Sequence, residues 1–308
     1  MTGGSRPHFA DRLAALVAER RSRVVLGLDP DPAALWPEAL ERIGGPGDGA
    51  HLARIRTAEA VTEHCRAAIV AAGPACVAVK LQLACFERLG APGWEALEQV
   101  VAIGRDHGLL VLADGKRGDV PVTATAYAQA LVGETPGPFG PVRGLAVDAF
   151  TANPLLGRDA LEPLADAAAA AGAGCFVLVR TSNPGAAELQ DEGEPPLHER
   201  LARLVDELGA PRLGEVGLSC VGAVTGATRP DHLGRLRELM PRAIFLLPGV
   251  GAQGGRVEEL GPAFAPHPAA GLVTASRSIV NARAERGGDS AAAAQAAAEE
   301  LRAASWNL

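Results

Sequence analysis

The sequence predicts an α/β protein of the (β/α)8 TIM-barrel class, with residues 1–308 forming a single domain. Two observations lead to this prediction. Short apolar runs recur eight times, and stretches of helical character separate them. Each run is almost continuously apolar, which is typical of parallel strands that are covered on both faces. Eight such strands alternating with helices indicate a closed barrel, a fold that commonly forms one domain of about 250 residues.

The expected strands are five to seven residues long, and amphipathic stretches such as 94–108 and 198–209 lie between them. A final Ala-rich helix is expected to begin near Asp289 and Ser290, a suitable N-cap region, and to pack outside the barrel. An open doubly wound sheet is the alternative, but no Gly-x-Gly-x-x-Gly motif follows the first strand. The strands are expected at 24–28, 76–81, 109–113, 144–150, 175–180, 215–221, 243–248 and 271–275.

Three segments have the composition of surface insertions in this framework. They are rich in glycine, proline or charged residues, which favour turns over regular structure. We expect loops near residues 44–49, 133–141 and 186–196.

Composition narrows the range of partners. The net charge is −7 and no basic tract stands out, which argues against a nucleic-acid partner. No apolar run approaches the roughly 18 residues of a membrane span, and the N-terminal residues lack the apolar core of a secretion signal. The five cysteines form no Cys-x-x-Cys pair, and the scattered histidines form no metal-binding motif. We therefore expect a cytoplasmic protein with reduced thiols and no metal site.

The lysine content points to a functional site. Of 29 basic residues only Lys80 and Lys116 are lysine, and the other 27 are arginine. Arginine cannot release its proton at a useful pH, and its planar group fills a different space. Lysine retained at two positions indicates that a compact ammonium group is required there. The alternative is that two lysines remain by chance.

Polar residues gather where the expected strands end, which is where the active site of such a barrel forms. Arginine after the last strand is well placed to clamp a phosphate with two hydrogen bonds. The residues concerned are Asp29 after the first strand, Lys80 in the second, Asp114, Lys116 and Asp119 after the third, Thr181, Ser182 and Asn183 after the fifth, Gln253 and Gly254 after the seventh, and Arg277 after the eighth.

The stretch 111–124, VLADGKRGDVPVTA, is the most specific of these. Alternate residues of a strand share a face, so Asp114 and Lys116 are expected on the same side, and Asp119 follows in a glycine-containing loop. Nearby carboxylates favour the protonated form of a lysine. Such a lysine is a poor nucleophile and a good proton donor. The alternative is a solvated cluster of salt bridges.

This stretch resembles the signature of the orotidine 5'-phosphate (OMP) decarboxylases, Asp-x-Lys-x-x-Asp-Ile/Val-Pro-x-Thr, from Asp114 to Thr123. Segments in the same order as in that family are LGLDP, VAVKLQLACFE, VRTSNPG, PGVGAQGG and ASRSI, so the resemblance spans about residues 24 to 282. The inserted loops and the Ser-Arg-Ser-Ile segment are similar to the longer bacterial subgroup.

The resemblance implies conversion of OMP to UMP and CO2 in pyrimidine biosynthesis, without a metal or another cofactor. In this reading the ammonium of Lys116 stabilises the carbanion formed at C6 and then protonates it, and Asp114 lies near the substrate carboxylate. The resemblance also implies a homodimer in which Asp119 and Thr123 reach the neighbouring subunit's site.

The remaining site residues take their roles from the same resemblance. It implies that Asp29 and Lys80 bind the ribose hydroxyls and that Ser182 reads the pyrimidine edge. Gln253, Gly254 and Arg277 are expected to hold the phosphate.

Two other functions stay open at this point. Barrel enzymes that act on sugar phosphates, such as keto-gulonate phosphate decarboxylase and hexulose-phosphate synthase, share the Asp-x-Lys-x-x-Asp pattern but use Mg²⁺. The continuation with Pro121 and Thr123, the Ser182 loop and Gln253 favour the nucleotide enzyme. A barrel that only binds nucleotides is the second alternative, although a binder has no need of a proton donor beside C6.

Overall fold

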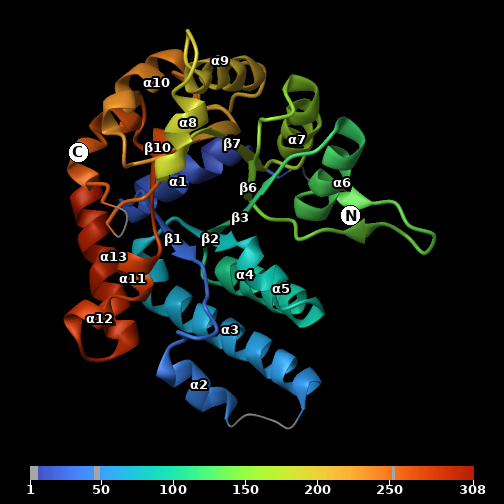
Figure 1. Cartoon of the computed structure of the whole chain (residues 1–308), viewed down its shortest axis with the longest axis vertical. Helices are drawn as coiled ribbons and strands as arrows, with labels where there is room; N and C mark the ends of the chain where they lie inside the picture. Colours follow the sequence, from blue (N-terminus) through green and yellow to red (C-terminus); the bar gives the residue numbers. More distant parts are fainter. Residues whose placement is uncertain (1–5, 45–48, 252–253) are drawn as a thin grey trace.

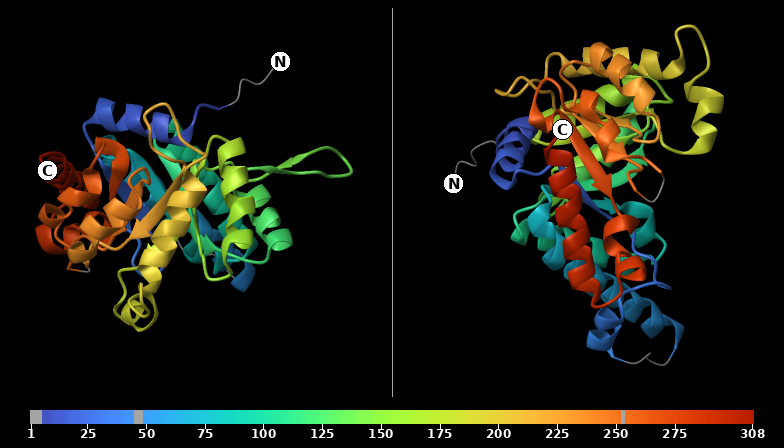
Figure 2. Two further views of the ribbon diagram at one scale, coloured as in Figure 1. Left: turned by 90° about the horizontal axis from the view of Figure 1, so that it is seen from above. Right: turned by 90° about the vertical axis from the view of Figure 1, so that its left-hand side faces the viewer.

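Eight parallel strands close into a barrel in this computed structural model, which describes residues 6–44, 49–251 and 254–308. Every neighbouring pair runs parallel, in the order β1-β10-β9-β8-β7-β6-β3-β2. Helices surround the barrel (Figures 1 and 2), so the predicted (β/α)8 fold is confirmed. Its strands are β1 (Val24–Leu28), β2 (Ala78–Gln82), β3 (Leu110–Arg117), β6 (Ala149–Ala152), β7 (Gly174–Arg180), β8 (Val221–Thr225), β9 (Phe245–Pro248) and β10 (Gly271–Ala275).

The strands are buried on both faces, which explains their continuous apolar character. Every residue of β1, β6, β8 and β10 is buried. Their side chains alternate between the barrel interior and the layer under the helices, and both environments exclude water. The first and last strands, 24–28 and 271–275, have the predicted bounds.

The helices cover the outside of the barrel. The last helix, α13, begins at Ser290, and the carboxylate of Asp289 accepts a hydrogen bond from the Ala292 amide at 2.9 Å, which confirms the predicted N-cap region. No helix in the described ranges is both long and apolar enough to cross a membrane. The α-helices are α1 (Phe9–Arg20), α2 (Pro37–Ile43), α3 (Ala50–Ala72), α4 (Leu83–Glu87), α5 (Ala91–Asp106), α6 (Pro121–Leu131), α7 (Arg158–Ala170), α8 (Ala187–Gln190), α9 (Leu197–Gly209), α10 (Leu233–Leu239), α11 (Arg277–Val280), α12 (Arg283–Arg286) and α13 (Ser290–Trp306).

Short 3-10 helices connect several of these elements. They are η1 (Gly73–Ala75), η2 (Pro184–Ala186), η3 (Pro230–His232), η4 (Val257–Glu259), η5 (Gly261–Phe264) and η6 (Pro268–Ala270).

Two strand predictions were misplaced. The run 215–221 is mostly a tight turn, in which the Gly214 amide bonds to the Leu218 carbonyl and Gly217 has a φ of +79°. The strand begins where that prediction ended, at Val221. The run 144–150 likewise enters its strand only at Ala149.

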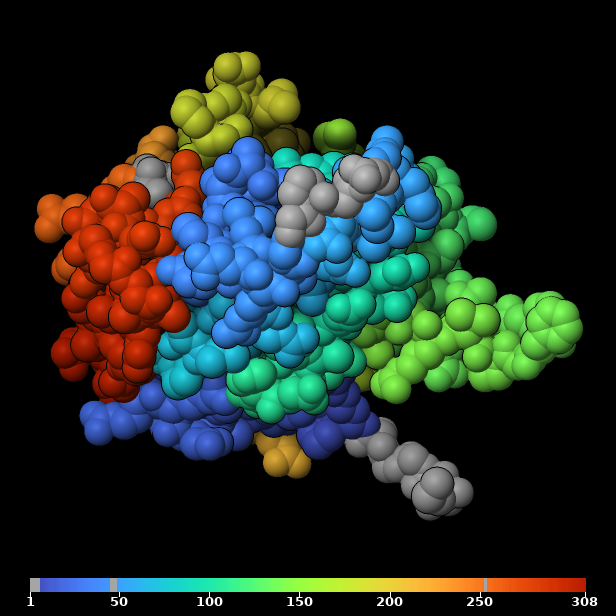
Figure 3. Space-filling model, turned by 90° about the horizontal axis from the view of Figure 1, so that it is seen from below, coloured from blue at the N-terminus to red at the C-terminus, as the bar shows by residue number. Residues whose placement is uncertain are grey.

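The predicted insertions contain some regular structure. The segment 133–141 was expected to be a loop, but strands β4 (Glu134–Thr135) and β5 (Val142–Arg143) form a small antiparallel sheet there. This arm projects from the body of the molecule (light green in Figure 3). The segment 186–196 also projects and includes the short helix α8. In the first insertion, residues 45–48 lie outside the described residues.

Candidate active site

A cavity of about 660 Å³ opens at the carboxyl ends of the barrel strands. Active sites of (β/α)8 barrels form at this face. Predicted site residues from five strand ends line the cavity together. They are Asp29, Lys80, Asp114, Lys116, Ser182 and Arg277.

Asp114 lies between two lysines at the centre of this group. Its Oδ1 atom is 2.7 Å from Nζ of Lys116, and its Oδ2 atom is 2.7 Å from Nζ of Lys80. Lys80 also lies 3.7 Å from Oδ1 of Asp29. The register of the sheet explains the pairing, because β2 and β3 lie side by side with Lys80 opposite Leu112 and Gln82 opposite Asp114. Alternating positive and negative charges therefore run across one wall of the cavity.

Burial and charge together set the protonation states of this pair. Burial alone would raise the pKa of Asp114, but the ammonium groups of Lys80 and Lys116 outweigh it and hold the pKa well below its usual range. Burial would lower the pKa of Lys80, yet the carboxylates of Asp114 and Asp29 outweigh it and raise the pKa. Asp114 is thus an anion and Lys80 a cation at neutral pH.

Lys116 is presented differently from Lys80. The side chain of Lys80 is 8% exposed, whereas that of Lys116 is 42% exposed. The backbone of Lys116 has a φ of +47°, in the left-handed region that residues with a side chain seldom adopt. Strained backbone of this kind clusters at functional sites. The ammonium of Lys116 can therefore contact a ligand in the cavity, whereas Lys80 is buried in the cavity wall and pairs with Asp114.

The carboxylate of Asp119 does not pair with Lys116 in this chain. Oδ1 of Asp119 accepts a hydrogen bond from the Val120 amide at 2.8 Å, and among the described ion pairs Lys116 contacts Asp114. The sequence predicted that the Lys116 ammonium lies between the carboxylates of Asp114 and Asp119. Within one chain, the Asp114 carboxylate instead lies between the ammonium groups of Lys80 and Lys116. The predicted role of Asp119, to complete the active site of a neighbouring subunit, stays a prediction.

The other predicted residues differ in where they lie. Arg277 begins helix α11 directly after β10, and its exposed side chain is at the rim of the cavity. Thr123 is exposed on α6, and among the described residues neither Thr123 nor Gly254 lines the cavity. The Gly254 amide bonds to the Gly251 carbonyl at 2.8 Å. Gln253 lies outside the described residues.

The polar side chains of the cavity wall that sequence reasoning missed include Gln82, Thr151, Gln190 and Thr274. Thr151 follows directly after the run 144–150, so its place at a strand end was a usable signal. Gln190 comes from α8, within a segment taken to be a plain loop, and its side chain accepts a hydrogen bond from the Thr181 amide at 2.8 Å. Only the fold brings Gln190 back to the strand end.

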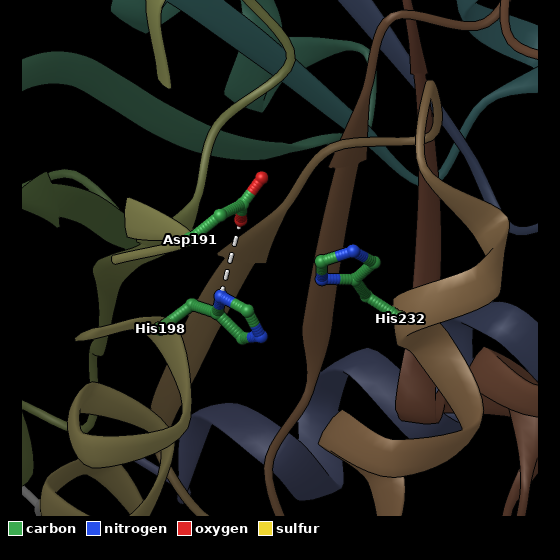
Figure 4. Close-up of side chains that lie close together, drawn as sticks. All are labelled: Asp191, His198 and His232. Carbon is green, nitrogen blue, oxygen red and sulfur yellow. Dashed lines mark ion pairs between the residues drawn. The ribbon is translucent and has the colours of Figure 1, made fainter. Parts of the chain in front are cut away.

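A second cluster brings Asp191, which follows α8, close to His198 of α9 and His232 of η3 (Figure 4). Nδ1 of His198 is 3.2 Å from Oδ1 of Asp191. Both oxygens of Asp191, however, accept hydrogen bonds from the guanidinium of Arg180, at 2.8 and 2.9 Å. Arg229 donates to Nε2 of His232 at 2.8 Å. Guanidinium groups thus bond to Asp191 and to His232, and Nδ1 of His198 lies 2.7 Å from the Gln190 carbonyl oxygen. The cluster is therefore a network that ties the loop after β7 to the barrel.

The closed barrel and the ammonium–carboxylate wall of its cavity define a (β/α)8-barrel enzyme with a site for an anionic substrate. Residues 22–295 match the orotidine 5'-phosphate decarboxylase / HUMPS family. The chain belongs to this family.

Individual relatives agree over almost the whole chain. The chain is 41% identical to orotidine 5'-phosphate decarboxylase of Deinococcus radiodurans, covering 97% of this chain and 98% of that protein. Identity to the enzyme of the same name from Rhodopirellula baltica is 39%, over 88% of each chain. The structure of Leishmania donovani OMP decarboxylase has a TM-score of 0.71 at 29% identity, covering 97% of this chain and 99% of that one.

Proposed function

We propose that this protein converts orotidine 5'-phosphate to UMP and CO2, a step of pyrimidine biosynthesis, without a metal or an organic cofactor. Family membership and the relatives named above support this proposal. The observation that carries it is the wall formed by Lys80, Asp114 and Lys116, with the Lys116 ammonium exposed to the cavity.

In this proposal each part of the substrate is assigned to residues that line the cavity. Asp29 and Lys80 would bind the ribose hydroxyls, and Ser182, in the loop after β7, would read the pyrimidine edge. Arg277 follows the last strand, where barrels of this class commonly bind phosphate, and Gln253 would add donors to it. Gly254 would join them only when its amide leaves the Gly251 carbonyl, to which it bonds at 2.8 Å. The phosphate would thus be held away from the reacting carbon, so that its binding energy can help to close the site.

The reaction needs a cation beside C6. When the bond from C6 to the carboxylate breaks, its electron pair stays on C6, in the plane of the ring and outside the π system. The Lys116 ammonium would stabilise this charge and then transfer a proton to C6. The neutral amine regains a proton from water. Asp114 keeps the ammonium in place through its Oδ1 atom, at 2.7 Å.

The charge pattern disfavours the Mg²⁺-dependent alternative within the same family. Each oxygen of the Asp114 carboxylate already has a lysine ammonium group at 2.7 Å. A magnesium ion bound there would have to displace one lysine and would then lie close to the other. Like charges at such short range in a buried wall repel strongly.

One assay distinguishes the candidates. Purified protein is mixed with OMP in the presence of EDTA, and the loss of OMP absorbance is followed together with UMP formation. We expect turnover that EDTA does not reduce and that the Lys116→Ala variant lacks. Turnover that EDTA abolishes and Mg²⁺ restores would favour the metal-dependent enzymes, and UMP binding without turnover would favour a nucleotide-binding protein.

We propose further that the protein is a homodimer with shared active sites. In this proposal Asp119 and Thr123 act in the partner's cavity. The exposure of neighbouring apolar side chains supports it, since Val120 and Val122 are 53% and 85% exposed at the start of α6. Apolar surface of this kind is typical of contacts between proteins.

We also propose a domain organisation and a cellular location for this protein. Residues 1–308 form one domain, which is supported by a single large cluster of buried side chains that runs from Phe9 to Ala298. The protein acts in the cytoplasm and has no nucleic-acid or membrane partner, as its acidic charge and reduced cysteines favour.

A further inference from the structure

Strand β6 supports the catalytic segment of β3 through a side chain. The two strands pair at Ala113 with Phe150 and again at Arg117 with Ala152, and their register shifts in between. Three residues of β3, from Asp114 to Lys116, therefore lie opposite one residue of β6, Thr151. A bulge of this kind re-aims side chains and leaves backbone groups without their ladder partners.

The hydroxyl of Thr151 takes the place of the missing ladder partner. Its Oγ1 atom accepts a hydrogen bond from the Lys116 amide at 2.8 Å. The same hydroxyl donates to Oδ1 of Asp114, also at 2.8 Å. Lys116 has a left-handed backbone at this point, with a φ of +47°. The hydroxyl thus contacts the backbone of the one residue and the carboxylate of the other.

Burial makes the two hydrogen bonds of the Thr151 hydroxyl costly to lose. Thr151 is 1% exposed, so water cannot readily replace a lost bond. A hydroxyl has one proton, and here Asp114 receives it, while the Lys116 amide occupies an acceptor position. Oδ1 of Asp114 also receives the Lys116 ammonium at 2.7 Å. Oδ1 of Asp114 therefore contacts both the Thr151 hydroxyl and the ammonium of Lys116, the proposed proton donor.

We infer that Thr151 is a positioning residue of the decarboxylation, which holds the Asp114 carboxylate and the left-handed Lys116 backbone so that the ammonium faces C6. This inference rests on the proposed function. Thr151 acts through Asp114 and Lys116, because both of its hydrogen-bonding roles are filled within the protein. Its contribution is therefore to the rate of the chemical step rather than to substrate binding.

Replacing threonine by valine tests this directly, since valine keeps the shape and removes the hydroxyl. In Thr151→Val the Lys116 amide and Oδ1 of Asp114 each lose a partner. A misplacement of about 1 Å at a reacting group costs on the order of 100-fold in rate. We expect kcat to fall by about 10- to 100-fold, with KM and the affinity for UMP little changed. Thr151→Ser keeps the hydroxyl and should restore most of kcat.

Thr225 provides the matched control. It is also a fully buried strand threonine, in β8, and its Oγ1 atom has no hydrogen-bond partner in the described parts of the chain. Thr225→Val makes the same chemical change without breaking a bond, so kcat should stay at the wild-type value. Thr151→Ala is a second variant without the hydroxyl, for use if the valine variant does not fold. Melting temperatures of all variants report on folding.

The outcomes separate this inference from the proposed function. If the wild-type protein does not decarboxylate OMP, the proposed function fails. If it does, the inference is overturned when Thr151→Val, or Thr151→Ala in its place, keeps kcat within twofold. It is also overturned when Thr151→Ser fails to restore kcat, or when Thr225→Val lowers kcat as much. A fall in kcat that serine reverses, at an unchanged KM, supports it.

Discussion

Nζ of Lys116 lies 2.7 Å from Oδ1 of Asp114, so the proposed proton donor and its nearest carboxylate form one ion pair at the cavity wall. The two side chains differ in exposure, at 42% for Lys116 and 8% for Asp114. The carboxylate is thus a fixed part of the wall, and the ammonium is the part that can meet a ligand.

Lys116→Ala should lower kcat by at least about 10³-fold, because both charge stabilisation and proton donation are lost. The melting temperature should change little, since this side chain is partly exposed. Lys116→Arg should be almost as inactive, because a guanidinium does not readily release a proton. The assay is loss of OMP absorbance. Activity within tenfold of wild type in either variant would contradict the assigned role.

Arg277→Ala should reduce kcat/KM for OMP by about 100-fold, or about 3 kcal/mol, the scale of a lost charge-assisted contact to phosphate. Both KM and kcat should change, because phosphate binding is expected to drive closure of the site. Orotidine without the phosphate should react slowly with the wild type and no more slowly with the variant.

Arg283→Ala is the control for this experiment. Arg283 is another exposed arginine in the same part of the chain, and it pairs with Glu38. Its removal should leave kcat/KM unchanged. An equal loss for both substrates in Arg277→Ala would mean that Arg277 serves the fold instead of the phosphate.

His64 should make stability depend on pH. It is buried, its Nδ1 atom accepts a hydrogen bond from the Trp36 amide at 3.2 Å, and burial lowers its pKa to about 4. The unfolded chain binds a proton near pH 6.5, so this stabilisation is complete above that pH and is lost as the pH falls toward 4. The free energy of unfolding should decrease by about 3 kcal/mol from pH 7 to pH 4 through this group alone.

Urea unfolding at several pH values measures this effect. The glutamine of His64→Gln does not titrate in this range. The free energy of unfolding of the wild type should therefore fall relative to that of the variant as the pH decreases from 7 to 4. Parallel curves at all pH values would show that His64 is not the group responsible.

The shared-site dimer predicts complementation. Lys116→Ala and Asp119→Ala chains should each be inactive alone. After subunit exchange, a mixed dimer has both defects in one site and none in the other. With random exchange about half of the dimers are mixed, so about one quarter of wild-type activity should return. If exchange is demonstrated and no activity returns, Asp119 acts within its own chain.

The sequence predicts the barrel better than it predicts the contacts inside it. Strands at 24–28 and 271–275 are predicted to the residue, because each short apolar run ends at a polar residue, Asp29 or Ser276. The run 215–221 was wrongly predicted as a strand from its apolar residues, because Gly217, with a φ of +79°, bends the chain back on itself. The hydrophobic pattern of a sequence does not reveal which glycine adopts a left-handed backbone.

The site shows the same division. Asp114 and Lys116 are two residues apart, so their shared face is readable from strand geometry alone. The contact between Lys80 and Asp114 depends on the register of two strands 34 residues apart, which hydrophobic pattern does not determine. Thr151 is harder still, because its importance comes from a bulge in the neighbouring strand.

Both lysine side chains of this protein line one cavity. Reagents that acylate amines commonly modify many surface lysines, but in this protein Lys80 and Lys116 are the only lysine side chains. Lys80 is 8% exposed, which leaves Lys116 as the accessible one. Attachment to a solid support through lysine would therefore proceed at the cavity and block it.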